Sequence, residues 1–123
     1  MGDTHVDSGR LRSSLAGHSK MKKILDEFVD GLPGQVASLN DLLERRELES
    51  LKRVAHKLRG AGGGYGFDRI TAVAKVAEQG IQEEKSIEEI AARVNDLVEL
   101  IRRVEGYDQG AERTECAIVA PVS

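Results

Sequence analysis

The sequence predicts an all-α fold: an antiparallel up-down four-helix bundle with a short additional N-terminal helix. Three observations support this fold class. Apolar residues recur at spacings of three and four along most of the chain, which is typical of helices that bury one face. No segment shows the strict alternation of a strand. Aromatic residues make up only 3% and tryptophan is absent, so the core must be aliphatic and rich in alanine, which suits closely packed helices.

The first part of the chain predicts a leader and two helices. Residues 1–17 mix Gly, Ser, Asp and Arg without sustained periodicity, so we expect a flexible leader there. A short helix is predicted over 20–31, with apolar positions at Ile24, Leu25, Phe28, Val29 and Leu32. Leu32-Pro33-Gly34 is expected to separate it from the next helix, because proline suits the first turn of a helix but not its interior. That next helix reaches about Arg45, with apolar positions at Leu32, Val36, Leu39, Leu42 and Leu43.

The middle of the chain predicts two helices joined by a glycine-rich turn. The earlier one begins near Glu47, and its apolar positions are Leu48, Leu51, Ala55, Leu58, Gly62 and Tyr65. The later one follows Gly66 and ends near Gly80, with apolar positions at Ile70, Val73, Ala74, Ala77 and Ile81.

The last helix has the clearest boundaries. Ser86-Ile87-Glu88-Glu89 is a capping-box sequence, in which a serine cap is followed three residues later by glutamate. A heptad-like set follows at Ile87, Ile90, Val94, Leu97, Ile101 and Val104, and Gly106 is expected to end the helix. Residues 106–123 lose the pattern and are predicted to form a poorly ordered tail. The bundle therefore occupies residues 18–105 as one domain.

Composition excludes several classes of function. The net charge of −3 gives no overall case for binding nucleic acid or an anionic membrane. No apolar run approaches the ~18 residues that a membrane span needs, and the N-terminus lacks the profile of a signal peptide. The single cysteine, Cys116, cannot form a disulfide within the chain, so a cytoplasmic setting is expected.

His56 and the glycines that follow it are the most informative feature. At 100° per residue, His56 lies roughly 125° from the centre of its helix's apolar seam, on the exposed flank. Gly60 and Gly63, four and seven residues later, share its stripe and leave that stripe without side chains. Gly62 lies on the seam, where it lets a neighbouring helix approach, and Gly64 and Gly66 are expected to end the helix. Together, Gly60, Gly62, Gly63 and Gly64 lower the stability of the helix by ~3–4 kcal/mol relative to alanine, and this cost calls for an explanation.

Basic residues surround this histidine. Between Arg45 and Arg59 there are six basic residues and two acidic ones, in a chain that is acidic overall. Arg59 lies three residues after His56, and Lys52 and Arg53 lie four and three residues before it. A solvated charged face is the ordinary explanation of such a run. Beside an uncovered imidazole, it also predicts a site for an anion.

The neighbourhood of His56 favours one kind of chemistry. General-base catalysis needs an orienting carboxylate and a nucleophile, and helical spacing brings no Asp, Ser or Cys beside the ring. Zinc needs three or four ligands, and the other histidines, His5 and His18, lie in the leader. The glycine run lacks the following Lys-Ser/Thr and the preceding strand of a nucleotide-binding loop. Nucleophilic attack by an imidazole nitrogen on a phosphoryl group remains, with nearby cations stabilising the phosphoryl oxygens.

At these residues the chain resembles the histidine-containing phosphotransfer (HPt) domain of two-component phosphorelays. The family's motif, roughly Ala-His-x-Leu-Lys-Gly followed by small residues and a later glycine, is matched by Ala55-His56-Lys57-Leu58-Arg59-Gly60-Ala61-Gly62 and Gly66. The resemblance covers about residues 18–105. Arg59 stands where lysine is more usual, and the Gly62-Gly63-Gly64 run is richer in glycine than the family's pattern.

The resemblance implies a role for each matching residue. His56 would be the phosphoacceptor, Arg59 the basic residue beside the phosphoryl group, and Gly60 the glycine that opens access to the ring. We expect Lys52 to assist Arg59. The expected docking surface for a receiver domain comprises Gly60, Gly63, Arg53 and Lys57.

The resemblance also implies partners and excludes others. The expected partners are receiver domains of response regulators, a hybrid histidine kinase, or both, with Mg²⁺ on the receiver and no cofactor on this chain. An ATP-dependent kinase would need an ATP-binding domain that this sequence does not contain, so we expect a phosphocarrier rather than an enzyme. We also expect the protein to be a monomer. Two alternatives stay open: an adaptor bundle that binds a receiver or kinase without carrying phosphate, and a structural bundle with a surface histidine.

Overall fold

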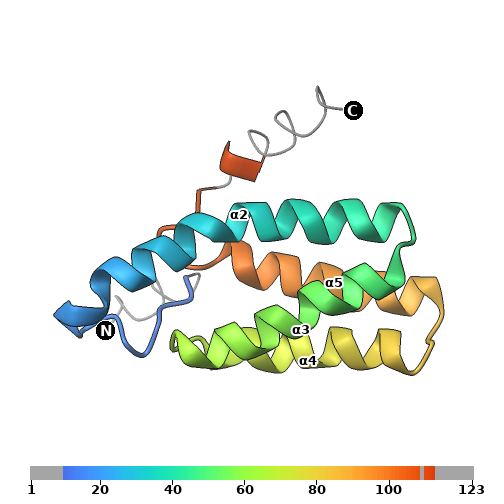
Figure 1. Ribbon diagram of the computed structural model, residues 1–123, viewed down its shortest axis with the longest axis horizontal. Coiled ribbons are helices and arrows are strands. Elements are labelled where there is room, and N and C mark those ends of the chain that lie inside the picture. The colour runs from blue at the N-terminus through green and yellow to red at the C-terminus, as the bar shows by residue number, and fades with distance from the viewer. Residues whose placement is uncertain (1–9, 109, 113–123) are drawn as a thin grey trace.

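The fold is an antiparallel helical bundle, seen in a computed structural model that describes residues 10–108 and 110–112. A 3₁₀ turn, η1 (Ser19–Met21), precedes four α-helices: α2 (Lys22–Glu44), α3 (Leu48–Gly64), α4 (Asp68–Gln82) and α5 (Ile87–Arg102). Consecutive α-helices run in opposite directions and are joined by short turns (Figure 1). The predicted four-helix bundle is therefore confirmed, and a short helical element, η1, precedes it. Within the described residues, no helix has the length and apolar character to span a membrane.

The predicted break at Leu32-Pro33-Gly34 is wrong, because α2 continues through Pro33. The short helix expected over 20–31 is therefore the first part of α2. The apolar stripe stays in phase across the proline, so burying Leu32 and Val36 on the core side offsets the lost hydrogen bond and the ring clash. The helix changes direction along its length, as expected where a proline interrupts its hydrogen bonds (Figure 1).

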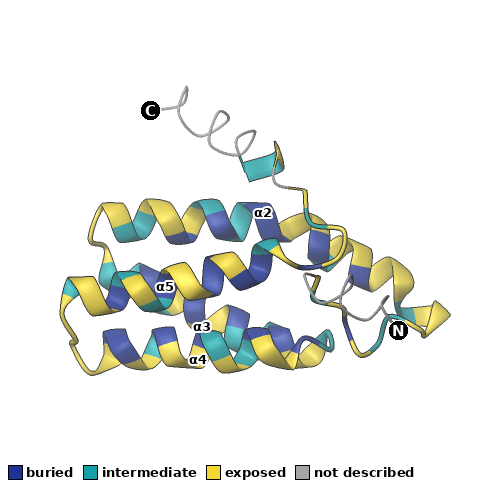
Figure 2. Ribbon diagram, turned by 180° about the vertical axis from the view of Figure 1, so that it is seen from behind, coloured by how far each residue is buried: buried dark blue, intermediate teal, exposed yellow. Residues whose placement is uncertain are grey.

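The core is aliphatic, as composition predicted. Buried faces of the four helices point toward one another, while the outward faces are exposed (Figure 2). Phe67 is the one aromatic residue among the buried apolar residues that the structure describes. The completely buried apolar side chains are Leu32, Val36 and Leu39 of α2, Leu51 and Ala55 of α3, Ile70, Ala74 and Ala77 of α4, and Val94, Leu97 and Ile101 of α5, with Val104 beyond it.

The segment before η1 is attached to the bundle, unlike the flexible leader predicted for residues 1–17. The Leu11 N–H donates to the Arg103 carbonyl at 2.7 Å, and Leu11 forms a parallel bridge with Val104. Ser13 is buried, and its Oγ donates to the Tyr65 carbonyl at 2.6 Å. Residues 1–9 lie outside the described part of the chain.

The predicted tail also begins with an attached segment. Glu112 accepts hydrogen bonds from Arg102 Nη2 at 2.7 Å and Nε at 3.0 Å, and the Tyr107 hydroxyl donates to it as well. These bonds connect Tyr107 and Glu112 to the end of α5. Residues 113–123, including Cys116, lie outside the described residues, so the prediction for them stays a prediction.

The serine cap of α5 and the glycine stop after α3 both form as predicted. Glu89 does not complete the capping box, because its carboxylate accepts from Arg93 instead. Ser86 Oγ accepts from the Glu89 N–H at 3.1 Å at the start of α5. At the end of α3, Gly66 has a φ of +83°, and the Phe67 N–H donates to the Gly62 carbonyl at 2.7 Å. This is a Schellman motif, in which a left-handed residue allows the chain to satisfy the last helical carbonyls.

Helices α2 and α4 end in the same motif without glycine. Arg46 has a φ of 61° and Glu84 a φ of 57° at the corresponding positions. The Lys85 N–H donates to the Gly80 carbonyl, and the Glu47 N–H to the Leu42 carbonyl, which are the longer bonds of the motif. A β-carbon in this left-handed conformation costs roughly 1–2 kcal/mol, so both turns are strained.

Replacing Glu84 by glycine should stabilise the protein. We expect Glu84→Gly to raise the free energy of unfolding by about 0.5–1 kcal/mol, because relief of the left-handed strain outweighs the greater freedom of the unfolded chain. Urea denaturation measures the change. Glu83→Gly is the matched control. Glu83 has a φ of −89°, so glycine relieves no left-handed strain there and the variant should be less stable than the wild type. Equal effects of the two substitutions would contradict this explanation.

Candidate functional site

His56 lies on the exposed side of α3, as the helical spacing predicted. Leu51, Ala55 and Leu58 hold the opposite side of α3 in the core. The His56 side chain is 67% exposed. The helix therefore fixes the backbone of this residue while leaving its ring open to a partner.

A carboxylate that sequence analysis missed holds the ring from the neighbouring helix. Glu78 of α4 places Oε2 2.9 Å from His56 Nδ1 and Oε1 2.9 Å from Arg59 Nη1. The Glu78 side chain is only 16% exposed, so this contact is partly shielded from water. Helical spacing from His56 reaches only residues of its own helix, whereas the orienting acid comes from α4.

The contact fixes which ring nitrogen faces solvent. Loss of hydration alone would raise the pKa of Glu78, but the hydrogen bonds from Arg59 and His56 outweigh it and hold that pKa below its ordinary value. Glu78 is therefore ionised at neutral pH and can only accept hydrogen bonds. In a neutral ring, Nδ1 must then carry the hydrogen, so Nε2 bears the lone pair.

The glycines after His56 divide between access and packing. A β-carbon on Gly60 would meet no atom within 4 Å, so this position is open space beside the ring's stripe. A β-carbon on Gly62 would lie 2.9 Å from the Thr71 nitrogen and 3.0 Å from the Phe67 carbonyl oxygen, which confirms that Gly62 lets α4 approach. Gly63 is exposed but borders this contact, since its β-carbon would lie 3.5 Å from Thr71 Oγ1.

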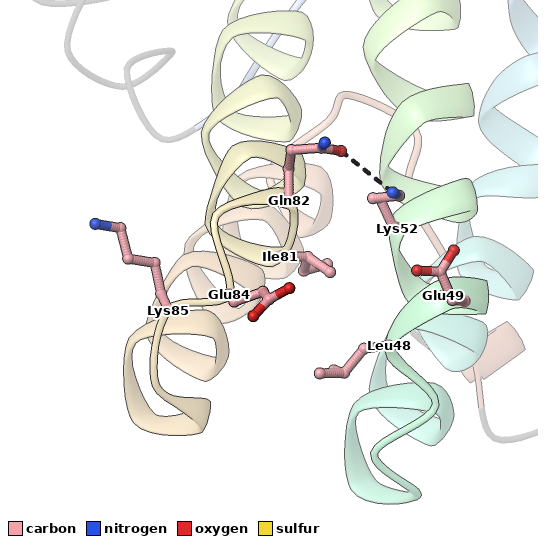
Figure 3. Close-up of a pocket in the computed structure, with 7 residues that line it drawn as sticks. All are labelled: Leu48, Glu49, Lys52, Ile81, Gln82, Glu84 and Lys85. Carbon is pink, nitrogen blue, oxygen red and sulfur yellow. Dashed lines mark hydrogen bonds between the residues drawn. The ribbon is translucent and has the colours of Figure 1, made fainter.

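The other predicted basic residues lie on both flanks of α3. Lys52 Nζ donates to Gln82 Oε1 of α4 at 3.2 Å and lines a surface hollow of about 540 Å³ (Figure 3). Lys57 lines a different groove, of about 310 Å³, between α2 and α3. Arg53 is exposed on α3. Of the predicted cations, Arg59 is the one that the structure brings together with His56, through Glu78.

The two surface hollows differ in character. The hollow beside Lys52 lies between the beginning of α3 and the end of α4, and its other lining residues are Leu48, Glu49, Ile81, Gln82, Glu84 and Lys85 (Figure 3). The groove beside Lys57 contains the stacked rings of Phe28 and Tyr65, whose centroids are 4.3 Å apart. Within the described residues, no group of three or more His, Cys, Asp or Glu side chains is placed to hold a metal ion.

Fold and site together define a class of protein: a four-helix bundle that presents one exposed histidine, held by a carboxylate, beside an open glycine. A family model described as the Hpt domain matches residues 23–106, and the chain belongs to this family. No curated protein and no solved structure shows a significant match. Hpt domains take part in two-component phosphorelays, where they interact with receiver domains and kinases and are phosphocarriers rather than kinases.

The two kinds of glycine should respond oppositely to alanine. We expect Gly60→Ala to stabilise the protein by up to about 1 kcal/mol, because the methyl group meets open space and alanine favours the helix. Gly62→Ala should destabilise it by about 1–3 kcal/mol, because the methyl group would press on the backbone of α4. Thermal unfolding of both variants checks this pair of signs, and a stabilised Gly62→Ala would contradict the packing role.

Proposed function

We propose that this chain is a phosphorelay intermediate. His56 accepts a phosphoryl group from the phosphoaspartate of a receiver domain and passes it to another receiver domain. The observation that carries this proposal is the anchoring of Nδ1 by Glu78, which leaves the lone pair of Nε2 on the solvent side of α3. The open space at Gly60 supports it, because the incoming aspartyl phosphate needs room beside the ring.

This geometry supports an in-line transfer. The receiver docks over the His56 face, and its phosphoryl group lies in line with Nε2. The lone pair of Nε2 forms the nitrogen–phosphorus bond, while the bond from phosphorus to the aspartyl oxygen breaks and its electron pair stays on the aspartate. Arg59, with Lys52 one turn before the histidine, stabilises the phosphoryl oxygens. The proposal assigns Mg²⁺ to the receiver and no cofactor to this chain.

The docking surface in this proposal surrounds the histidine. Gly60 and Gly63 supply the open stripe, and the exposed Arg53 and Lys57 supply positive charge that attracts an acidic partner. The phosphoryl group comes from a receiver domain rather than from ATP. The proposal retains the monomeric state and the cytoplasmic setting expected from the sequence.

Removing the imidazole should abolish transfer. Incubation with a phosphorylated receiver domain should place an acid-labile label on the wild-type protein and none on His56→Gln, because glutamine offers no nucleophile. His18→Gln is the control, since it removes another exposed histidine. ATP alone should label neither protein. A labelled His56→Gln would sink the proposal, and an unlabelled wild type that still binds the receiver would identify an adaptor.

Filling the open stripe should block transfer without unfolding the bundle. We expect Gly60→Glu to slow transfer at least about tenfold, because like charges brought together in an interface cost several kcal/mol. The fold should persist, since this position faces open space. Circular dichroism and the transfer assay measure the two effects, with Gly17→Glu as the control at an open position outside α3. Normal transfer by Gly60→Glu would show that partners do not approach over this stripe.

A further inference from the structure

Glu78 is shared between the nucleophile and its neighbouring cation. One carboxylate oxygen lies 2.9 Å from His56 Nδ1 and the other lies 2.9 Å from Arg59 Nη1. Both partners are on α3, whereas Glu78 is on α4. The contact therefore affects both the proton on the ring and the direction of the guanidinium group. The inference below rests on the proposed function.

We propose that Glu78 is a positioning residue that keeps His56 Nδ1 protonated while Nε2 carries the phosphoryl group, so that the phosphohistidine is discharged rapidly. When Nε2 attacks phosphorus, the ring still bears the hydrogen on Nδ1 and becomes an imidazolium. In water that proton would readily leave. Beside the Glu78 carboxylate it is retained, because an adjacent opposite charge favours the charged form of the ring.

The retained proton matters for the second half of the relay. When the next aspartate attacks phosphorus, the nitrogen–phosphorus bond breaks and its electron pair returns to Nε2. A ring already protonated on Nδ1 leaves as neutral imidazole and needs no further proton. A ring without that proton would leave as an anion, which is a much poorer leaving group. The carboxylate thus lowers the barrier to discharge.

The surrounding charges do not cancel this effect. Four cations lie within a helical turn of the pair and disfavour a positive ring: Lys52, Arg53 and Arg59 on α3, and Lys75 on α4. Glu78 is in direct contact with Nδ1, however, and is partly shielded from water, so its attraction is the stronger influence. The Arg59 charge is in turn directed at Glu78 Oε1 and at the dianionic phosphoryl group.

Arg59 suits this arrangement better than lysine would. Guanidinium presents five N–H groups in a rigid fork, so Nη1 can remain on Glu78 while Nη2 or Nε reaches a phosphoryl oxygen. A lysine ammonium is a single point charge and would divide between the two anions. Glu78 therefore also places Arg59 beside the phosphoryl group.

Glu78→Gln separates charge from shape. Glutamine keeps an oxygen that can accept from Nδ1–H but removes the negative charge. Its amide nitrogen cannot accept, so the hydrogen bond from Arg59 is lost as well. Phosphoramidate, a small phosphoryl donor, can load the protein without a receiver domain. Wild type and variant are both prepared with His5→Gln and His18→Gln, so that His56 is the one histidine able to take the label. Loss of the acid-labile label is then followed across pH. We expect the Glu78→Gln phosphoprotein to last about tenfold longer at neutral pH, and the midpoint of its pH profile to move to lower pH. Glu83→Gln, with the same charge change at the end of α4, should match the wild type.

Each outcome has one meaning. If Glu78→Gln and the wild type have the same pH profile and the same label lifetime, the role of Glu78 is wrong, whatever the receiver assay gives. If the wild type takes no label from a phosphorylated receiver, the proposed function fails separately, because phosphoramidate loading reports only on the histidine. Glu78→Ala adds a comparison in which both charge and hydrogen bond are lost. It should also release the ring, which ¹⁵N chemical shifts of the imidazole detect as a mixture of tautomers.

Discussion

The close contact between α3 and α4 at Gly62 is the constraint on which the site depends. Thr71 of α4 lies against Gly62, and its hydroxyl donates to the Arg59 carbonyl at 2.6 Å. This contact fixes the relative position of the two helices along their axes. Three contacts between α3 and α4 join residues whose numbers have nearly the same midpoint, at the turn formed by Gly66 and Phe67. They are the contacts of Gly62 with Thr71, His56 with Glu78, and Lys52 with Gln82. The absence of a side chain at Gly62 therefore determines which acidic residue of α4 contacts His56.

Features that depend on a single helix could be predicted from the sequence. The exposure of His56 follows from the phase of its own helix's apolar seam, and the Ser86 cap follows from a local spacing. The predicted break at Pro33 is wrong because packing outweighs the local preference of proline. The apolar positions on either side of the proline lie on one stripe, and burying that stripe keeps α2 continuous.

The carboxylate at the site was not predicted, because its role appears only when two helices are set against each other. Helical offsets from His56 reach residues of α3 alone. The sequence did hold a usable signal, since an antiparallel pair folded about Gly66 and Phe67 brings residue 77 or 78 opposite residue 56. Ala77 is buried in the core, so Glu78 is the member of that pair at the edge of the seam.

The ring's environment makes the two flanks of α3 chemically different. The α4 flank is occupied by Glu78, which holds Nδ1 and accepts from Arg59. The α2 flank carries Lys57 and the groove that contains the stacked rings of Phe28 and Tyr65. A partner that approaches Nε2 can make apolar and positively charged contacts on the α2 side without disturbing the hydrogen bonds that hold the ring. Separating the two roles in this way allows one exposed histidine to be rigidly oriented and still accessible.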